Sequence, residues 1–328
     1  MNLCKLILLV ITLFSLFQFS FAHVEYVVTE DERERFAGID FDFLLRALKN
    51  PFNVLLIFLT IAFVLSIYFL LKRSKLFMSY AARIEEKAES YYDLTSWMLR
   101  LGLGIAFIGA GVEKVLISPL LPISLPFPFL EILLGFLFLL GFLLTPTIFL
   151  SIILFLFALS KNFYLLGNLE VLASLIALLI LSQPKPGLDD LLGIPSFSFL
   201  RSFKDFVPLI LRIGIGSAMM FLAVYEKFLN PHLSEVVVYN YHLTSIIPVS
   251  PEMWVFSAGV IEFLVGLFLF LGFKTRLTSA IAFIVLSLSF FYFGEEVYSH
   301  VTLFSVLSVL FVTGGCKLSI DNRYKNKT

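Results

Sequence analysis

The chain has 328 residues, of which 59% are hydrophobic and only 15% are charged. Its mean hydropathy of +0.96 is far above the average for soluble domains, so we predict an all-α polytopic membrane protein in a lipid bilayer. Lys and Arg total 24, as do Asp and Glu, and this zero net charge gives no reason to expect a nucleic-acid partner.

The sequence shows no motif for a metal or a nucleotide. Only Cys4 and Cys316 are present, and Cys4 lies in a segment expected to be removed, so the mature chain would form no internal disulfide. No Cys-x-x-Cys, Walker, Rossmann or His-Glu-x-x-His pattern occurs. We therefore expect no metal site, and no cofactor is evident.

Residues 1–22 have the features of a signal peptide. Lys5 gives a positive start, Leu6–Phe19 is apolar, and Ser20-Phe21-Ala22 is a small-x-small cleavage site. Cleavage would make His23 the mature N-terminus, on the outer side of the membrane. The alternative is an anchor helix that is not cleaved.

A short polar segment, 23–50, is expected to form an extracytoplasmic cap. Residues 51–71 are apolar and predict the first lasting transmembrane helix. The basic run Lys72-Arg73-Ser74-Lys75 follows and predicts the cytoplasmic side, with a cytoplasmic linker over 72–95. A basic tail, 322–328, places the C-terminus in the cytoplasm as well.

The rest of the chain contains two similar units, 96–190 and 206–321, joined by a cytoplasmic linker over 191–205. Each begins with Leu-Arg-x-Gly-x-Gly and continues with Glu-x3-Gly-x5-Gly, starting at Glu131 and Glu262. The same spacing separates each of these glutamates from Asp190 or Asp321, which predicts an internal duplication. Four helices per unit imply parallel units, and nine transmembrane helices in all. The eight helices predicted in the units are 97–117, 129–144, 146–159, 169–181, 207–225, 253–271, 277–293 and 301–312.

Charged residues recur at both ends of the units. At the inner end we expect Arg100 to pair with Asp190, and Arg212 with Asp321, because a guanidinium and a carboxylate can make bidentate contact.

At the outer end we expect Glu113 and Lys114 to approach Glu131. In the second unit, Glu226 and Lys227 should approach Glu262. Close helix approach at the glycines that recur with the same spacing in both units would permit these contacts. The charges would either clamp the bundle or form a pocket for an anionic or quinone-like ligand, since ionisable residues inside a membrane are costly.

In this topology all four histidines lie on the outer side of the membrane: His23, His232, His242 and His300. Tyr239, Tyr241, Glu295, Glu296 and Tyr298 lie near the last three in the sequence. Such a group could shuttle protons or bind a metal, and a mature N-terminal His23 could offer its amine and imidazole to copper. The alternative is scattered, solvent-facing histidines. No predicted span contains the histidine that a haem would need.

The motifs Leu-Arg-x-Gly-x-Gly with a following Glu-Lys, then Glu-x3-Gly-x5-Gly, then a closing Gly…Asp, resemble those of the DoxX/DoxD-like membrane proteins. The second unit is the better match, through Gly272-Phe-Lys-Thr-Arg276 and Leu-Ser-Ile-Asp321, whereas the first has Thr145-Pro146 in place of Arg276-Leu277. The resemblance implies a tandem pair of four-helix units. DoxD-type members resemble the membrane subunit of thiosulfate:quinone oxidoreductase, and some DoxX-type members are linked with thiol-stress complexes.

Two functions remain open from the sequence. One is an enzyme subunit that passes electrons from a small extracytoplasmic reductant, such as thiosulfate, to quinone, with a redox partner subunit. In it Glu226, Lys227 and Glu262 would line the site, and the histidines would handle protons. The other is a non-catalytic scaffold or a small-molecule carrier.

Overall fold

The computed structural model describes residues 23–181, 187–194 and 198–325. The described residues form helices and turns, with one isolated bridge between Val115 and Pro122 and no named strand. Six of their helical stretches are long and apolar enough to cross a membrane. This confirms the prediction of an all-α polytopic membrane protein. The predicted signal peptide lies outside the described residues.

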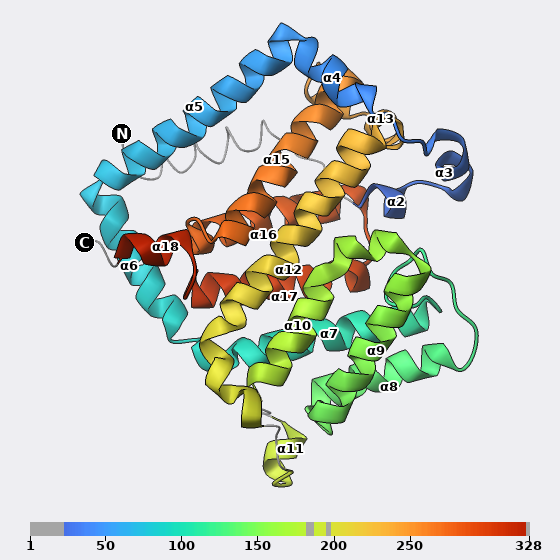
Figure 1. The fold of residues 1–328 in the computed structure, drawn as a ribbon, viewed down its shortest axis with the longest axis vertical. Helices are drawn as coiled ribbons and strands as arrows, with labels where there is room; N and C mark the ends of the chain where they lie inside the picture. Colours follow the sequence, from blue (N-terminus) through green and yellow to red (C-terminus); the bar gives the residue numbers. More distant parts are fainter. Residues whose placement is uncertain (1–22, 182–186, 195–197, 326–328) are drawn as a thin grey trace.

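The two units contain four main helices each. Figure 1 shows how these helices are arranged. In the first unit these are α7 (Thr95–Val112), α8 (Phe127–Leu140), α9 (Leu144–Lys161) and α10 (Leu169–Leu181). In the second they are α12 (Val207–Leu222), α15 (Pro251–Leu271), α16 (Thr275–Phe293) and α17 (Val297–Thr313).

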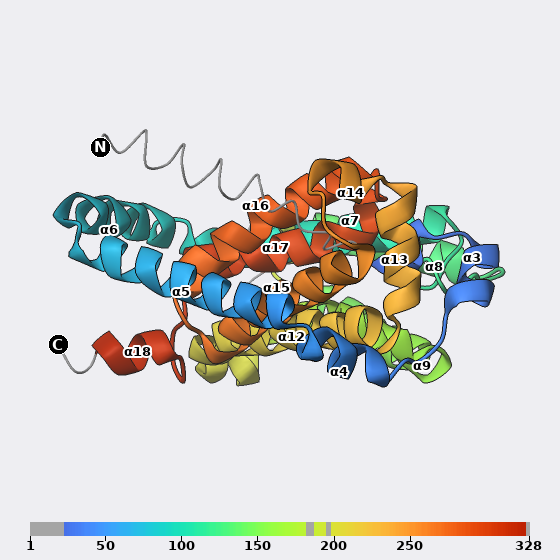
Figure 2. The same ribbon diagram turned by 90° about the horizontal axis from the view of Figure 1, so that it is seen from above.

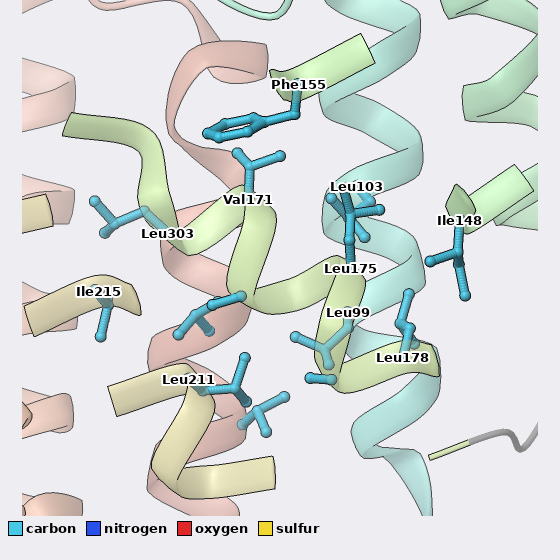
Figure 3. Close-up of a cluster of buried hydrophobic side chains, with 14 of the residues drawn as sticks. Leu99, Leu103, Ile148, Phe155, Val171, Leu175, Leu178, Leu211, Ile215 and Leu303 are labelled. Carbon is cyan, nitrogen blue, oxygen red and sulfur yellow. The ribbon is translucent and has the colours of Figure 1, made fainter. Parts of the chain in front are cut away.

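The units are interlocked through their first and last helices. The first helix of each unit, α7 or α12, packs on α8 or α15 of its own unit, and also on the last helix of the other unit. A continuous apolar core results, in which leucines of α7, α10, α12 and α17 meet (Figure 3). Examples are Leu103, Leu175, Leu211 and Leu303, all buried. The hydrophobic packing therefore joins the two units into one body.

Glycines permit the same close helix crossing in both units. A Cβ atom on Gly135 would lie 2.6 Å from the carbonyl oxygen of Gly104, and one on Gly216 would lie 2.7 Å from that of Gly266. Larger residues would force the backbones apart. The predicted role of the glycine motifs is thus visible in both units.

The inner charge pairs do not form as predicted for the second unit. Asp321 accepts the backbone N–H groups of Lys274 (2.7 Å) and Thr275 (2.9 Å), and so caps the start of α16. Arg212 donates instead to the carbonyls of Lys317 and Leu318, each at 3.4 Å. The prediction of a bidentate Arg212–Asp321 contact was wrong because the carboxylate is already occupied by the helix end.

In the first unit, the residue equivalent to Asp321 is Asp189 rather than Asp190. Asp189 accepts the N–H groups of Leu143 and Leu144, both at 2.8 Å, and caps the start of α9. Arg100 donates to the carbonyls of Phe138 (2.9 Å) and Leu139 (3.1 Å), at the negative end of the α8 dipole. The sequence alignment of the two units was therefore shifted by one residue at this point.

The N-terminal segment covers one end of the second unit. It contains α2 (Val24–Val27), α3 (Glu30–Phe36) and α4 (Asp42–Lys49), and its apolar side chains pack on α13 (Pro231–Asn240) and α15. Figure 2 shows α3 and α13 at one end of the molecule, and α6 (Lys75–Glu89) and α18 (Ile320–Lys325) at the other. Helix α5 (Pro51–Arg73) connects α4 to α6.

The region between the predicted helices 207–225 and 253–271 is largely helical. A π-helix, Ala223–Leu229, continues α12, and α13 and the short α14 (Leu243–Ile246) follow. Apolar side chains of this region, such as Leu233 and Val237, are buried in one cluster with Trp254 and Val24. These contacts explain why the segment folds instead of remaining an open loop.

Arg276 fixes the helix that precedes the first unit. Its guanidinium lies 2.7 Å from Glu85 and 3.0 Å from Glu89, both on α6, and it also donates to the carbonyls of Phe311 and Val312. The first unit has Thr145 at the corresponding position. The difference between the two sequences thus has a structural reason, since α6 contacts the second unit here.

Candidate functional site

A buried ion-pair group lies where α12 ends. Lys227 is 1% exposed, forms an ion pair with its neighbour Glu226, and has its Nζ atom 3.3 Å from Oε2 of Glu262 on α15. In the π-helix Ala223–Leu229, both Glu226 and Lys227 face the protein interior. Such widened turns are frequent at functional sites. The contact expected between Glu226-Lys227 and Glu262 is present.

The first unit has no such ion pair. Helix α7 ends at Val112, five residues earlier than we predicted, and Lys114 takes a positive φ of 57°. Glu113 and Lys114 are exposed, while Glu131 is fully buried and accepts the N–H of Ile117 at 2.9 Å. The prediction that Glu113-Lys114 approaches Glu131 was wrong, because the chain turns outward where the second unit continues as a π-helix.

The N-terminal segment enters the ion-pair group. The backbone N–H of Val24 donates to Oε1 of Glu226 at 2.9 Å, and the hydroxyl of Tyr164 donates to the same oxygen. The hydroxyl of Tyr26 lies 3.0 Å from that of Ser118 and donates to Oδ1 of Asn168 at 3.1 Å. Residues of the segment therefore bond to both units, since Glu226 belongs to the second unit, and Ser118 and Asn168 belong to the first.

His300 lies in the same place, in the first turn of α17. Its Nε2 atom is 3.0 Å from Oε2 of Glu295, and both side chains are almost completely buried. Its ring centroid lies 5.1 Å from that of His23, which in turn stacks on Tyr26 at 4.5 Å. The idea of solvent-facing histidines is therefore wrong for these two, because α17 begins at Val297 and draws His300 inside.

Glu170 adds a further buried carboxyl group. It lies at the start of α10, is 1% exposed, and accepts the hydroxyl of Thr302 at 3.4 Å. We call the whole set the polar cluster. It consists of His23, Tyr26, Tyr164, Asn168, Glu170, Glu226, Lys227, Glu262, Glu295 and His300.

The other two candidate histidines lie outside the polar cluster. His232 is half-exposed at the surface and lies 3.3 Å from both Asp40 and Glu235. His242 is exposed and occupies a positive-φ position before α14. The prediction that they belong to the candidate ligand site was wrong, because α13 and α14 place both side chains at the surface.

Sequence reasoning missed Tyr26, Tyr164, Asn168 and Glu170. Glu170 could have been predicted from the sequence, because an acidic residue in an apolar span is costly and usually has a partner or a functional role. The tyrosines could not, since their sequence neighbours give no sign that they meet Glu226 across the two units.

Carboxyl groups dominate the polar cluster. It contains Glu170, Glu226, Glu262 and Glu295, but only one lysine. A buried charge without a partner costs several kcal/mol, so the cluster must hold protons on some carboxyl groups or accept further cations. The cluster therefore contains several buried groups that can hold a proton.

In the N-terminal segment, which lies outside the membrane spans, burial and the nearby charges shift the pKa values of two side chains. Burial, and then the nearby Glu226, raises the pKa of the Glu25 carboxyl to about 7, although Arg33 opposes the shift. Burial, with His300 and Lys227 nearby, holds the pKa of the His23 imidazole well below its usual value. A neutral His23 can accept or donate hydrogen bonds inside the cluster.

Metal binding is not indicated by the side chains alone. In the part of the chain that the structure describes, no group of three or more His, Cys, Asp or Glu residues is arranged to hold a metal ion. The arrangement instead offers hydroxyl, imidazole and ammonium donors beside carboxyl acceptors.

Comparison with known families identifies the second unit. The DoxX family model matches residues 207–295, which include α12, Lys227, Glu262 and all of α16. This part of the chain is similar to DoxX membrane proteins. No curated protein and no solved structure matches the chain.

The DoxX match covers the ion-pair side of the polar cluster. His300, the N-terminal segment and the residues of the first unit lie outside the matched range. The polar cluster is thus assembled from the DoxX-like region and from parts of the chain that the family model does not reach.

Proposed function

We propose that this DoxX-like protein is the membrane subunit of a quinone-linked oxidoreductase, with the polar cluster as its quinone site. The observation that carries the proposal is a group of buried proton carriers, Tyr164 with Glu226 and His300 with Glu295, inside an apolar helical bundle. Ionisable groups of this kind in a membrane protein mark ligand sites or proton relays.

The chemistry of the cluster suits a neutral quinone better than an anion. Quinone oxygens accept hydrogen bonds, and Lys227, Tyr164 and His300 are donors. Reduction to quinol consumes two electrons and two protons. The imidazole of His300 and the carboxyl group of Glu295, with Nε2 and Oε2 3.0 Å apart, are the groups that would supply protons for such a transfer.

The reductant would be oxidised outside the polar cluster. With thiosulfate, two ions lose one electron each and join as tetrathionate, and these two electrons with two protons convert quinone to quinol. The excess of buried carboxyl groups would repel thiosulfate, so we assign its oxidation to a redox partner subunit.

The test is reduction of a soluble quinone by the purified protein in lipid, with its co-purifying partners, using thiosulfate, sulfite and thiols in turn. Tyr164→Phe removes only a hydroxyl and should lower the rate about a hundredfold. Tyr239→Phe, at an exposed position, is the matched control. Absence of reduction with all three donors, in a folded protein with its partners, would reject the proposal.

A scaffold or carrier is the second candidate function. It is favoured by the internal pairing of Lys227 with Glu226 and Glu262, and by the hydrogen bonds through which the N-terminal segment joins both units. In a scaffold, Tyr164→Phe would weaken assembly with the partners and leave any quinone reduction unchanged.

The proposed orientation places His23 outside the cell and the C-terminus in the cytoplasm. The N-terminal helix α3 and the C-terminal helix α18 lie at opposite ends of the molecule, which supports it (Figure 2). We further propose that 96–190 and 206–321 arose by duplication. The equivalent capping by Asp189 and Asp321 supports this division.

A further inference from the structure

The start of the described chain is built into the polar cluster. His23 is 2% exposed, although it follows a stretch that resembles a signal peptide. Its ring stacks on Tyr26 and lies beside His300. A residue next to a cleavage site is usually exposed and poorly ordered unless something ties it down. Here the interior of the protein holds it.

The backbone at this point is close to a buried carboxylate. The N–H of Val24 donates to Glu226 at 2.9 Å. The nitrogen of His23 is one residue earlier, within about 4 Å of the Val24 nitrogen by covalent geometry. A charged amine at His23 would therefore lie close to the Glu226 carboxylate.

The polar cluster lacks positive charge. Its four carboxyl groups face one lysine, and the pKa of the His23 imidazole is lowered, so this ring does not supply the missing charge at neutral pH. Nδ1 of His23 and Oε2 of Glu170 also have no hydrogen-bond partner. An α-amine has an ordinary pKa near 8 and would be charged beside carboxylates.

We propose that cleavage after Ala22 frees the α-amine of His23 inside the polar cluster, where it acts as a second cation beside Lys227. Processing would thereby complete the site. The new amine would bond to the second unit near Glu226, while Tyr26, three residues later, bonds to Ser118 and Asn168 of the first unit. The inference does not depend on the proposed function, since its tests require no turnover.

The first test is the intact mass and N-terminal sequence of the chain purified from membranes. We expect His23 as the first residue. Ala22→Leu should block cleavage, whereas Phe21→Leu keeps the small-x-small pattern and is the matched control. A first residue other than His23 in the wild-type chain would overturn the proposal.

The second test measures the reactivity of the new amine. An amine-reactive acetylating reagent should modify His23 at least about tenfold more slowly in the folded protein than in the denatured protein, because the amine is buried. Glu226→Gln should make this labelling faster, and Glu235→Gln, at the surface near His232, should not. Equal labelling of folded and denatured wild-type protein would overturn the proposal even if the chain begins at His23.

Discussion

Glu131 and Glu262 occupy the same position in the two units, but only Glu262 has a lysine beside it. Nζ of Lys227 lies 3.3 Å from Glu262, whereas Glu131 accepts the backbone N–H of Ile117 at 2.9 Å. Both glutamates are buried. The second unit therefore carries a charged network, and the first unit uses the equivalent carboxyl group to hold a loop.

Replacing Lys227 should destabilise the protein strongly. Lys227→Met would leave Glu226 and Glu262 buried without their cation, and removal of one partner from a buried pair costs about 3–5 kcal/mol. Unfolding of the purified protein in a mild detergent, followed by denaturant titration, measures the loss. Lys114→Met is the matched control, because Lys114 is the exposed equivalent and should change stability by less than about 0.5 kcal/mol. Equal effects of the two variants would contradict the ion-pair network.

The two equivalent glutamates should respond differently to the same substitution. Glu131→Gln keeps an oxygen that accepts the Ile117 N–H, so stability should change little or rise. Glu262→Gln removes one of the two carboxylates of Lys227 and should cost about 1–3 kcal/mol. The same denaturant titration compares them. A larger loss in Glu131→Gln than in Glu262→Gln would show that the first unit holds an ion pair after all.

The sequence was sufficient to predict the helical units and their glycine crossings. Long apolar runs separated by charged turns determine the helices, and glycine spacing reports where backbones approach. The contact of Lys227 with Glu262 also followed from two charges that apolar spans could not leave unpaired.

The rest depended on geometry that no local pattern encodes. Glu113-Lys114 and Glu226-Lys227 have the same sequence, yet one pair follows a helix end and the other lies in a π-helix. Asp321 looked like a partner for Arg212, but backbone N–H groups at a helix start compete for the same carboxylate. The burial of His23 could not be predicted, because it requires the N-terminal segment to dock between two units that are distant in sequence.

Arg276 should control the position of α6. Arg276→Ala removes the contacts with Glu85 and Glu89 and the bonds to two carbonyl groups of α17, so α6 should detach from the bundle more often. We expect hydrogen exchange in α6 to become about tenfold faster, with little change in α12. Arg83→Ala, on the exposed face of α6, is the control. Unchanged exchange in α6 would show that other contacts hold this helix.

Docking of the N-terminal segment should weaken as the pH rises. The pKa of Glu25 is about 7 in the folded protein, against an ordinary 4.5. Because the folded value is the higher one, the segment is favoured below pH 4.5 and loses this advantage as the pH passes through 7. Hydrogen exchange of residues 24–28, corrected for its intrinsic pH dependence, should therefore be several-fold faster at pH 8 than at pH 6.

Glu25→Gln should remove this dependence. The neutral side chain would not be repelled by Glu226, so exchange at pH 8 should approach the wild-type value at pH 6. Glu30→Gln, five residues along in the exposed first turn of α3, should leave the pH profile unchanged. A wild-type profile in Glu25→Gln would mean that another group, such as the His23 imidazole, controls docking in this pH range. That group would act in the opposite direction, because its pKa is lowered and its charging at low pH opposes docking. The sign of the wild-type slope between pH 6 and pH 8 therefore separates the two residues.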